Sequence, residues 1–278
     1  MTAAQVWLRD GLVPAPEALV PVNDRGFTSG DGVFEAMKVV DGRPFAVTRH
    51  LRRLANSADI VSLGLPEDLD LRAVITQTIE ANAERLGYLA RLRITVTAGS
   101  APAGILRSGE GPTVVVTVDP QQPHPDSLTV ITVPWRHNNH SAVSGAKTTS
   151  YAENLVILER ARAAGADEAL MADTDGRLCE GTTSNVILEV DGRLVTPSLA
   201  TGCLPGVTRD LLIEWGIVEE LDVPFEQVAR ASEILLSSST RDLIPVELID
   251  GRPMPAPGPL GGEAAVQFAL RVDEDIDP

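Results

Sequence analysis

Two stretches of mixed strand and helix patterning, separated by a proline-rich segment, constrain this chain more than any other feature. Residues 119–127 read Asp-Pro-Gln-Gln-Pro-His-Pro-Asp-Ser, and their three prolines exclude a helix and favour an extended connector. With 278 residues, the chain is long enough for two cores of ordinary size. We therefore expect a two-domain α/β (α+β) fold, with an N-terminal domain over 1–118, a linker over 119–127 and a C-terminal domain over 128–278.

Local patterns in the N-terminal half predict a hairpin followed by helices. Residues 34–40 and 44–47 have strand-like composition and flank Asp41-Gly42, a pair that favours a type I′ turn. Thr48 is placed to cap a helix, because apolar residues recur at helical spacing after it. A second helical pattern covers residues 71–86.

Residues 91–98 alternate between apolar and polar side chains. Such alternation predicts a half-buried strand, because successive side chains of a strand point to opposite faces. Leu92, Ile94, Val96 and Ala98 would share the buried face, and Arg91, Arg93, Thr95 and Thr97 the other.

The C-terminal half repeats the mixed pattern. Short strands are separated by turn pairs such as Asp175-Gly176 and Asp191-Gly192. The sequence predicts strands near 128–134 and 233–237, and helices near 151–164 and 206–215.

Charge and cysteine content exclude several classes of protein. The net charge of −16 disfavours binding to nucleic acid or to anionic membranes. No apolar run reaches 18 residues, and the two cysteines, Cys179 and Cys203, are too few for a disulfide scaffold. We therefore expect a cytoplasmic protein without a membrane partner.

The histidines give no sign of a metal site. His137 and His140 lie three positions apart, but no third residue follows at metal-ligand spacing. We expect no metal, and packing or hydrogen-bonding roles for these side chains.

The scarcity of lysine draws attention to two positions. Of 23 basic residues only Lys38 and Lys147 are lysines, and the others are arginines. An amine can lose its proton when buried and attack a carbonyl group, whereas a guanidinium remains charged. A lysine in this chain is therefore a candidate nucleophile, although two surface lysines are the simpler alternative.

One candidate chemistry for Lys147 is acyl transfer. Ser144-Gly-Ala-Lys147 matches the S-x-x-K motif of serine acyl-transfer enzymes. That motif requires the serine and lysine one helical turn apart and a later Lys-Thr-Gly strand. Gly145 weakens a helix here and no lysine follows Lys147, so this alternative is disfavoured.

A second set of motifs uses more of the chain. Gly-Ala-Lys-Thr-Thr-Ser-Tyr-Ala-Glu-Asn surrounds Lys147, and Glu-Gly-Thr-Thr-Ser-Asn-Val-Ile begins at Glu180, 33 positions later. Upstream stand Asp-Arg-Gly-Phe at 24–27, Gly-Asp-Gly-Val-Phe-Glu at 30–35 and His-Leu-Arg-Arg-Leu at 50–54. Pro-Gly-Val-Thr-Arg at 205–209 and Ser-Ser-Ser-Thr at 237–240 follow.

In this order the motifs resemble the class IV (fold type IV) pyridoxal-phosphate aminotransferases. That family includes D-amino acid and branched-chain amino acid transaminases and aminodeoxychorismate lyase. The resemblance implies pyridoxal 5′-phosphate in the cleft between two domains, with Lys147 as the catalytic Schiff-base lysine and Glu180 as partner of the pyridine nitrogen. It also implies further cofactor-binding residues, namely Arg53, Arg136, Tyr151, Ser184, Asn185, Val207, Thr208, Ser239 and Thr240.

The chemistry explains why these residue types are needed. Lys147 can carry the cofactor aldehyde as an imine and, as a free amine, can move a proton. A carboxylate at Glu180 keeps the pyridine nitrogen protonated, so that the ring accepts electrons. The backbone amides at the start of the helix after Gly206 suit a phosphate.

The substrate subclass is indicated by the strand around Glu35. Residues 30–60 most resemble D-amino acid transaminases, including Glu35 and Lys38. Members of that group hold the substrate carboxylate with an arginine and a histidine just after the strand that ends in Gly99, where this sequence has Ala103 and Ile105.

Other arginines must therefore bind the carboxylate. Arg91, Arg93 and Arg25 are candidates because a guanidinium binds a carboxylate through two hydrogen bonds, and Phe34 is expected beside them. For Arg91 and Arg93 the alternative is a solvent-facing edge strand.

We accordingly expect a transaminase that moves an amino group from a D-amino acid or small primary amine to a 2-oxo acid. The main alternative is aminodeoxychorismate lyase, which releases 4-aminobenzoate and pyruvate, and a further one is a branched-chain L-amino acid aminotransferase. A catalytically inactive binding module is disfavoured because Lys147 and Glu180 are both present. The resemblance also implies a homodimer, in which a loop of the neighbouring subunit completes the substrate pocket.

Overall fold

The computed structural model describes residues 3–102, 104, 106–107 and 111–278, and the chain forms two compact units. The first unit comprises Met1–Pro123, Ala146–Tyr151 and Ile276–Pro278, and the second comprises His124–Gly145 and Ala152–Asp275. This division differs from the expected ranges because two later segments hydrogen-bond to the first unit. The Thr149 amide donates to the Gly32 carbonyl (2.8 Å), and the Ala46 amide donates to the Ile276 carbonyl (2.7 Å).

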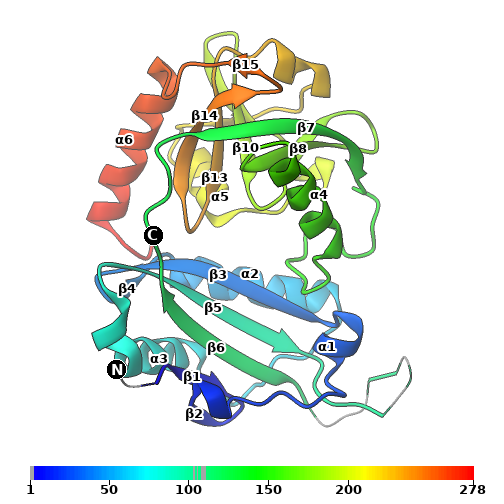
Figure 1. Ribbon diagram of the computed structural model, residues 1–278, viewed down its shortest axis with the longest axis vertical. Helices are drawn as coiled ribbons and strands as arrows, with labels where there is room; N and C mark the ends of the chain where they lie inside the picture. Colours follow the sequence, from blue (N-terminus) through cyan, green and yellow to red (C-terminus); the bar gives the residue numbers. More distant parts are fainter. Residues whose placement is uncertain (1–2, 103, 105, 108–110) are drawn as a thin grey trace. The chain divides into compact units, whose positions relative to one another are not determined.

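The first unit contains one six-stranded sheet. Its strand order is β2-β1-β6-β5-β3-β4, and its long strands are antiparallel to their neighbours. Figure 1 shows α2 and α3 packed along this sheet. The strands are β1 (Gln5–Leu8), β2 (Gly11–Pro14), β3 (Gly32–Val40), β4 (Arg43–Pro44), β5 (Leu89–Thr97) and β6 (Thr113–Pro120); the helices are η1 (Ala15–Glu17), α1 (Arg25–Ser29), α2 (Val47–Ile60) and α3 (Leu71–Leu86).

Alternation along β5 separates a core face from a polar face, as the sequence predicts. Leu92, Ile94 and Val96 are fully buried in the core with residues of both helices. Arg91 and Arg93 lie on the opposite face, where they pair with Lys38 and Ala36 of β3. Because β5 has β6 on one side and β3 on the other, the edge-strand alternative for these arginines is wrong.

The hairpin of β3 and β4 turns as the sequence predicts. Asp41 and Gly42 both have positive φ (48° and 73°), as a type I′ turn requires. The second strand ends at Pro44, because the chain turns at Ala46 (φ 50°) and enters α2.

The start of α2 differs from the sequence prediction. Ala46, not Thr48, occupies the N-cap position. The Thr48 amide instead donates to the carboxylate of Asp277 (2.7 Å), a residue 229 positions later. The C-terminal segment thus supplies the acceptor that a local cap would otherwise provide.

The second unit contains a nine-stranded mixed sheet. Its order is β12-β11-β10-β13-β14-β7-β8-β9, with β15 paired to β14, and β7 is parallel to both of its neighbours. Helix α4 packs on β8, α5 on β13 and α6 on β14 (Figure 1). The strands are β7 (Leu128–His137), β8 (Glu168–Asp173), β9 (Leu178–Gly181), β10 (Asn185–Val190), β11 (Arg193–Thr196), β12 (Glu219–Glu220), β13 (Ile234–Ser238), β14 (Asp242–Ile249) and β15 (Arg252–Pro253); the helices are α4 (Ala152–Ala163), η2 (Leu199–Thr201), α5 (Val207–Glu214), η3 (Phe225–Ala229) and α6 (Pro259–Glu274). Over the described ranges, no helix combines the length and the apolar character needed to cross a membrane.

The pairing of β8 with β9 contains a bulge. Met171 pairs with Glu180, but Ala172 pairs with Leu178, so Cys179 is an extra residue without an opposite partner. Such a bulge redirects the side chains around it. The bulge at Cys179 lies next to Glu180, a residue that the sequence motifs single out.

Candidate active site

The backbone of Lys147 is fixed from two sides within the first unit. The Phe34 amide donates to the Lys147 carbonyl (2.9 Å), and the Lys147 amide donates to Ser57 Oγ of α2 (3.0 Å). The Lys147 amine lies 4.3 Å from the centroid of the Phe34 ring and 5.7 Å from that of Tyr151. Lys147 is therefore presented on a rigid segment, with its amine against aromatic rings.

The structure shows why the upstream motif has a glycine at position 30. The hydroxyls of Thr149 and Ser150 both donate to its carbonyl (2.8 and 3.0 Å). Gly30 has φ 64°, and a Cβ there would lie 2.6 Å from Ser150 Oγ. A side chain would thus displace the segment that carries Lys147.

Behind the Phe34 position, a buried carboxylate orients Arg53. Glu35 is fully buried and accepts two hydrogen bonds from Arg53, at 2.8 Å from Nε and 2.7 Å from Nη2. His50 Nδ1 lies 2.7 Å from the same carboxylate. This network was not predicted from the sequence, although an acidic residue inside a mostly apolar strand was its one visible signal.

Burial alone raises the pKa of Glu35, but the charge and hydrogen bonds of Arg53, together with His50, lower it to about 2. Burial lowers the pKa of His50 despite its contact with Glu35. Glu35 is therefore ionised and His50 neutral at pH 7, with the Nδ1 proton directed to the carboxylate.

We expect acid to destabilise the fold through this network. The low pKa of Glu35 contributes stability that is present above about pH 4.5 and is lost as the pH falls toward 2, about 3 kcal/mol in all. The lowered pKa of His50 adds a further loss of folding stability that begins below about pH 6.5, because the unfolded chain then binds a proton that the native chain does not.

The Glu35→Gln variant tests this expectation by urea unfolding at several pH values. It should lose about 3–5 kcal/mol at pH 7, because Arg53 stays buried without its partner, and its stability should vary less between pH 4.5 and 2. Glu159→Gln is the control, because the Glu159–Arg162 pair is exposed. Equal losses for the two variants would contradict the role given to Glu35.

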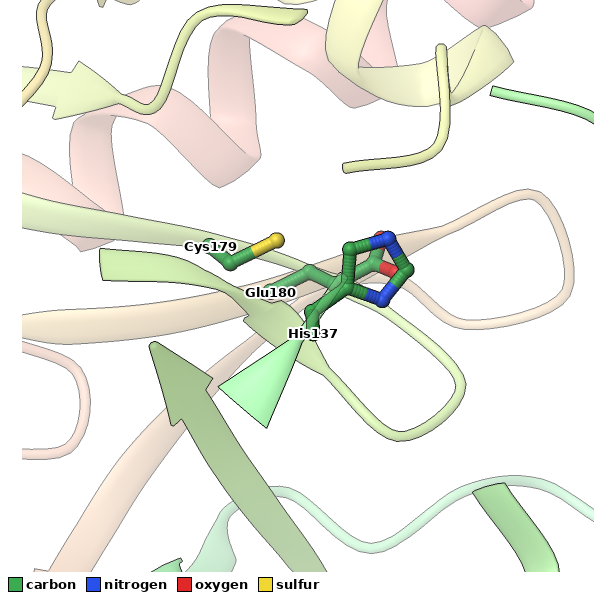
Figure 2. Close-up of side chains that lie close together, drawn as sticks. All are labelled: His137, Cys179 and Glu180. Carbon is green, nitrogen blue, oxygen red and sulfur yellow. The ribbon is translucent and has the colours of Figure 1, made fainter. Parts of the chain in front are cut away.

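In the second unit, Glu180 and Asn185 hold one loop. The Leu204 amide donates to Glu180 Oε2 (2.9 Å), and Asn185 Nδ2 donates to the Leu204 carbonyl (2.9 Å). Glu180 lies next to the bulged Cys179 and close to His137, as Figure 2 shows. The two predicted residues thus fix the chain just before α5.

The start of α5 has the features of an anion site. Its N-cap is Gly206, which provides no side-chain cap, and a Cβ there would collide with Asn185 Oδ1. The hydroxyls of Thr208, Ser184 and Ser237 are buried and have no hydrogen-bond partner among the described residues. Uncapped amides and buried hydroxyls are donors that suit a phosphate group.

A comparison with family models decides between the candidate chemistries. The model described as Amino-transferase class IV matches residues 32–249. The chain belongs to this family. Class IV aminotransferases use pyridoxal 5′-phosphate, and solved structures of similar fold contain it.

Three similar proteins illustrate the range of the family. A D-alanine aminotransferase of Bacillus licheniformis is 30% identical over 270 residues, covering 94% of this chain and 93% of the relative. A bifunctional aminodeoxychorismate lyase / D-amino acid transaminase of Mycobacterium tuberculosis is 28% identical over 266 residues, covering 85% and 88%. The structure of a branched-chain aminotransferase of Thermoproteus uzoniensis with norvaline superposes with a TM-score of 0.89 at 27% identity, covering 97% and 95%.

These comparisons confirm the family, the two-domain α/β fold, the enzyme class and the cofactor expected from the sequence. The residues of this aminotransferase fit that cofactor. In the first unit Lys147 offers an amine and Arg53 a guanidinium. In the second unit Glu180 offers a carboxylate, and Ser184, Thr208 and Ser237 offer buried hydroxyls without a partner among the described residues. These are the kinds of group that suit an aldehyde, a pyridine nitrogen and a phosphate.

The serine acyl-transfer alternative is wrong. Lys147 lies outside any helix, and Ser144 lies in a turn, so the two are not one helical turn apart. The match to the aminotransferase family over residues 32–249 supports a different chemistry for the chain.

Several predicted residues occupy other surroundings. Arg25 is buried in an ion pair with Asp31 (3.1 Å), and Arg136 is exposed, 5.9 Å from the Phe225 ring. Ser239 is buried, and the Thr240 carbonyl lies 3.0 Å from His124 Nε2. Ala103 and Ile105 lie outside the described residues.

Proposed function

We propose that this aminotransferase moves the amino group of a D-amino acid or a small primary amine to a 2-oxo acid. The contacts of one ring support this proposal. The Arg93 guanidinium carbon lies 3.8 Å from the centroid of the Phe34 ring, which the Lys147 amine also contacts. Arg93, the proposed cation for the substrate carboxylate, thus contacts the same ring as the amine of Lys147, which would act on the amino group.

The face around Arg93 is basic although the whole chain is acidic. Arg91 of β5 lies opposite Lys38 of β3 and opposite Asp119 of β6, and Arg93 lies two residues along β5, so that three cations outnumber one carboxylate. Burial, followed by the positive charge of Arg91, lowers the pKa of Arg93. Concentrated positive charge on this face favours substrates that carry carboxylates, as both amino acids and 2-oxo acids do.

When bound, pyridoxal 5′-phosphate supplies an aldehyde carbon that takes up amino groups and a ring that accepts electrons. Lys147 would hold the aldehyde carbon through Nζ and, as a free amine, would move the proton of the substrate α-carbon. Glu180 would hold a proton on the pyridine nitrogen. Arg53 and the α5 donors would bind the phosphate, and Arg93 would orient the substrate through its carboxylate.

The choice of a D-amino donor rests on similarity. The strand that carries Glu35 and Lys38 resembles D-amino acid transaminases, and the 30% identity to D-alanine aminotransferase over most of both chains supports the same choice. The similarity to the bifunctional lyase / transaminase favours aminodeoxychorismate lyase as the second candidate.

One spectroscopic experiment separates the candidates. Purified holoenzyme is mixed separately with D-alanine, L-leucine and aminodeoxychorismate, and the cofactor absorption is followed. The proposal expects D-alanine to convert the cofactor to its amine form. Conversion by L-leucine alone would instead identify a branched-chain transaminase, and formation of 4-aminobenzoate would identify the lyase.

Arg93→Gln should raise the KM for the amino donor by about 10- to 100-fold, because one charge-assisted contact to a carboxylate contributes about 1.5–3 kcal/mol. Cofactor affinity should stay unchanged. Arg91→Gln is the matched control, because Arg91 is an exposed arginine on the same strand face. A larger increase in KM for Arg91→Gln than for Arg93→Gln would show that Arg93 is the wrong arginine for the carboxylate.

We also propose that the smallest active unit is a cytoplasmic homodimer. The implied completion of the substrate pocket by a neighbouring subunit supports the dimer, and two free, buried cysteines support a reducing compartment. Active holoenzyme should therefore sediment with twice the mass of one chain. Activity that sediments with the mass of a single chain would exclude the dimer.

A further inference from the structure

Three metal-ligating side chains converge in the second unit, although their spacing in the sequence gave no sign of it. A ring nitrogen of His137, Sγ of Cys179 and a carboxylate oxygen of Glu180 all lie within 4.8 Å of one another. Figure 2 shows the imidazole beside the Glu180 carboxylate, with the Cys179 sulfur nearby. Cys179 and Glu180 are buried, and His137 is half-buried.

Irregular strand pairing produces this convergence. Cys179 and Glu180 are neighbours in β9 and would point to opposite faces of a regular strand. Because Cys179 is the extra residue of the bulge, both side chains reach the same cluster. The register of β7 on β8 also shifts between Thr132 and Arg136, just before His137.

Two side chains of the cluster, those of His137 and Cys179, have few polar contacts, whereas Glu180 Oε2 accepts the Leu204 amide. His137 Nε2 is buried and has no hydrogen-bond partner within the described part of the chain. Cys179 Sγ makes one weak hydrogen bond, to the Thr201 carbonyl at 3.3 Å. A buried polar atom without a partner is uncommon in proteins and points to a missing ligand.

We propose that His137, Cys179 and Glu180 form a binding site for one divalent ion of the zinc class in the cofactor-free protein. Imidazole, thiolate and carboxylate are the three donor types that zinc accepts, and three protein ligands leave a fourth position for water. Zinc-bound donors lie about 3.5 Å apart at usual bond lengths, and the three donors here lie within 4.8 Å of one another, so no pair has to close by more than about 1.3 Å. Binding breaks the S–H bond of Cys179, releases its proton to solvent and forms a metal–sulfur bond.

The site overlaps the place assigned to the cofactor. Glu180 is both a proposed metal ligand and the proposed partner of the pyridine nitrogen, so the inference that ion and cofactor exclude each other rests on the proposed function. The metal site itself does not rest on it. A bound zinc-class ion would then slow cofactor binding because it occupies Glu180, and Lys147 would not be one of its ligands.

Cobalt is the probe, because Co²⁺ takes zinc sites and a thiolate ligand gives it a charge-transfer band in the near ultraviolet. The full-length apoprotein is titrated with Co²⁺ in chelator-treated buffer. We expect one ion per chain, the charge-transfer band, and loss of the band when Zn²⁺, which binds more tightly, is added. Absence of the band in the wild-type apoprotein overturns the proposal.

Matched variants identify the ligands. Cys179→Ser should abolish the band, whereas Cys203→Ser should keep it, because Cys203 is also buried but lies outside the cluster. His137→Gln should weaken binding by at least about tenfold, and His140→Gln, at an exposed histidine, should not. Loss of the band in Cys203→Ser overturns the proposal even if Cys179→Ser fails to fold, because Cys179 is then the one remaining thiol.

The same titration on holoenzyme separates the two inferences. Exclusion of Co²⁺ by bound cofactor supports both the site and the assignment of Glu180. Equal binding to holoenzyme and apoprotein, with the band intact, overturns the assignment of Glu180 to the pyridine nitrogen while supporting the metal site.

Discussion

Lys147→Ala is expected to lower transaminase turnover by more than about 10³-fold while the fold remains intact. The variant loses both the covalent attachment of the cofactor and the amine that moves the substrate proton, and positioned acid–base catalysis alone contributes about 10²–10⁴-fold. The fold should survive because the hydrogen bonds to Phe34 and Ser57 use the backbone of residue 147. Turnover is measured beside circular dichroism and thermal unfolding.

Lys38→Arg is the control for this experiment. Lys38 is the one other lysine, and its amine lies 4.9 Å from the Phe45 ring. Arginine retains the charge but cannot attack a carbonyl, so this variant should keep covalently bound cofactor. Borohydride reduction of holoenzyme followed by peptide mapping should label Lys147. Label on Lys38, or near-normal turnover of Lys147→Ala, would contradict the assignment.

Glu180→Gln is expected to lower turnover by about 10²–10³-fold, and excess cofactor should not restore it. Glutamine keeps the size of the side chain but removes the negative charge that holds a proton on the pyridine nitrogen, and preorganised electrostatic groups contribute effects of this size. The contact with the Leu204 amide can persist through the amide oxygen of glutamine. The loss should therefore appear in kcat.

Arg53→Ala should fail in a different way. Loss of a charge-assisted contact to the phosphate should weaken cofactor affinity by about 1.5–3 kcal/mol, and added cofactor should restore turnover. The Arg53→Ala variant also leaves Glu35 buried without its main partner. Arg53→Ala and Glu180→Gln are therefore both assayed well below their unfolding temperatures. Full recovery of Glu180→Gln with cofactor, and none for Arg53→Ala, would show that the two roles are exchanged.

Local sequence patterns predicted those elements whose stability depends on nearby residues. The alternation in β5 specifies which of its side chains face the core, and the helical pattern over 71–86 predicts α3; the structure has both. The turn at Asp41-Gly42 follows from backbone preferences of the pair itself. Where a distant residue took part, as at the start of α2, the local prediction failed.

The candidate site divides in the same way. Ordered motifs predicted the family, which the comparison confirms, and they predicted roles for Lys147, Arg53 and Glu180, because catalysis requires particular chemical groups in a particular order along this kind of chain. Arg25, expected near the substrate carboxylate, lies against Asp31, and Arg136, expected near the cofactor, lies against Phe225. These contacts with neighbouring side chains could not be predicted from residue type.

By itself, the sequence determined the enzyme family, the cofactor and the elements with strong local periodicity. Only the tertiary structure decided that Glu35 is buried against Arg53 and His50, that Asp277 binds the start of α2, and that a bulge brings Cys179 and Glu180 to one side. Each of these depends on pairing between different elements, which are 15 to 18 positions apart for Glu35 and its partners and 229 positions apart for Asp277 and Thr48. Such pairing is set by how whole faces pack and by which buried polar groups must find partners, and neither leaves a periodic signal in the residues themselves.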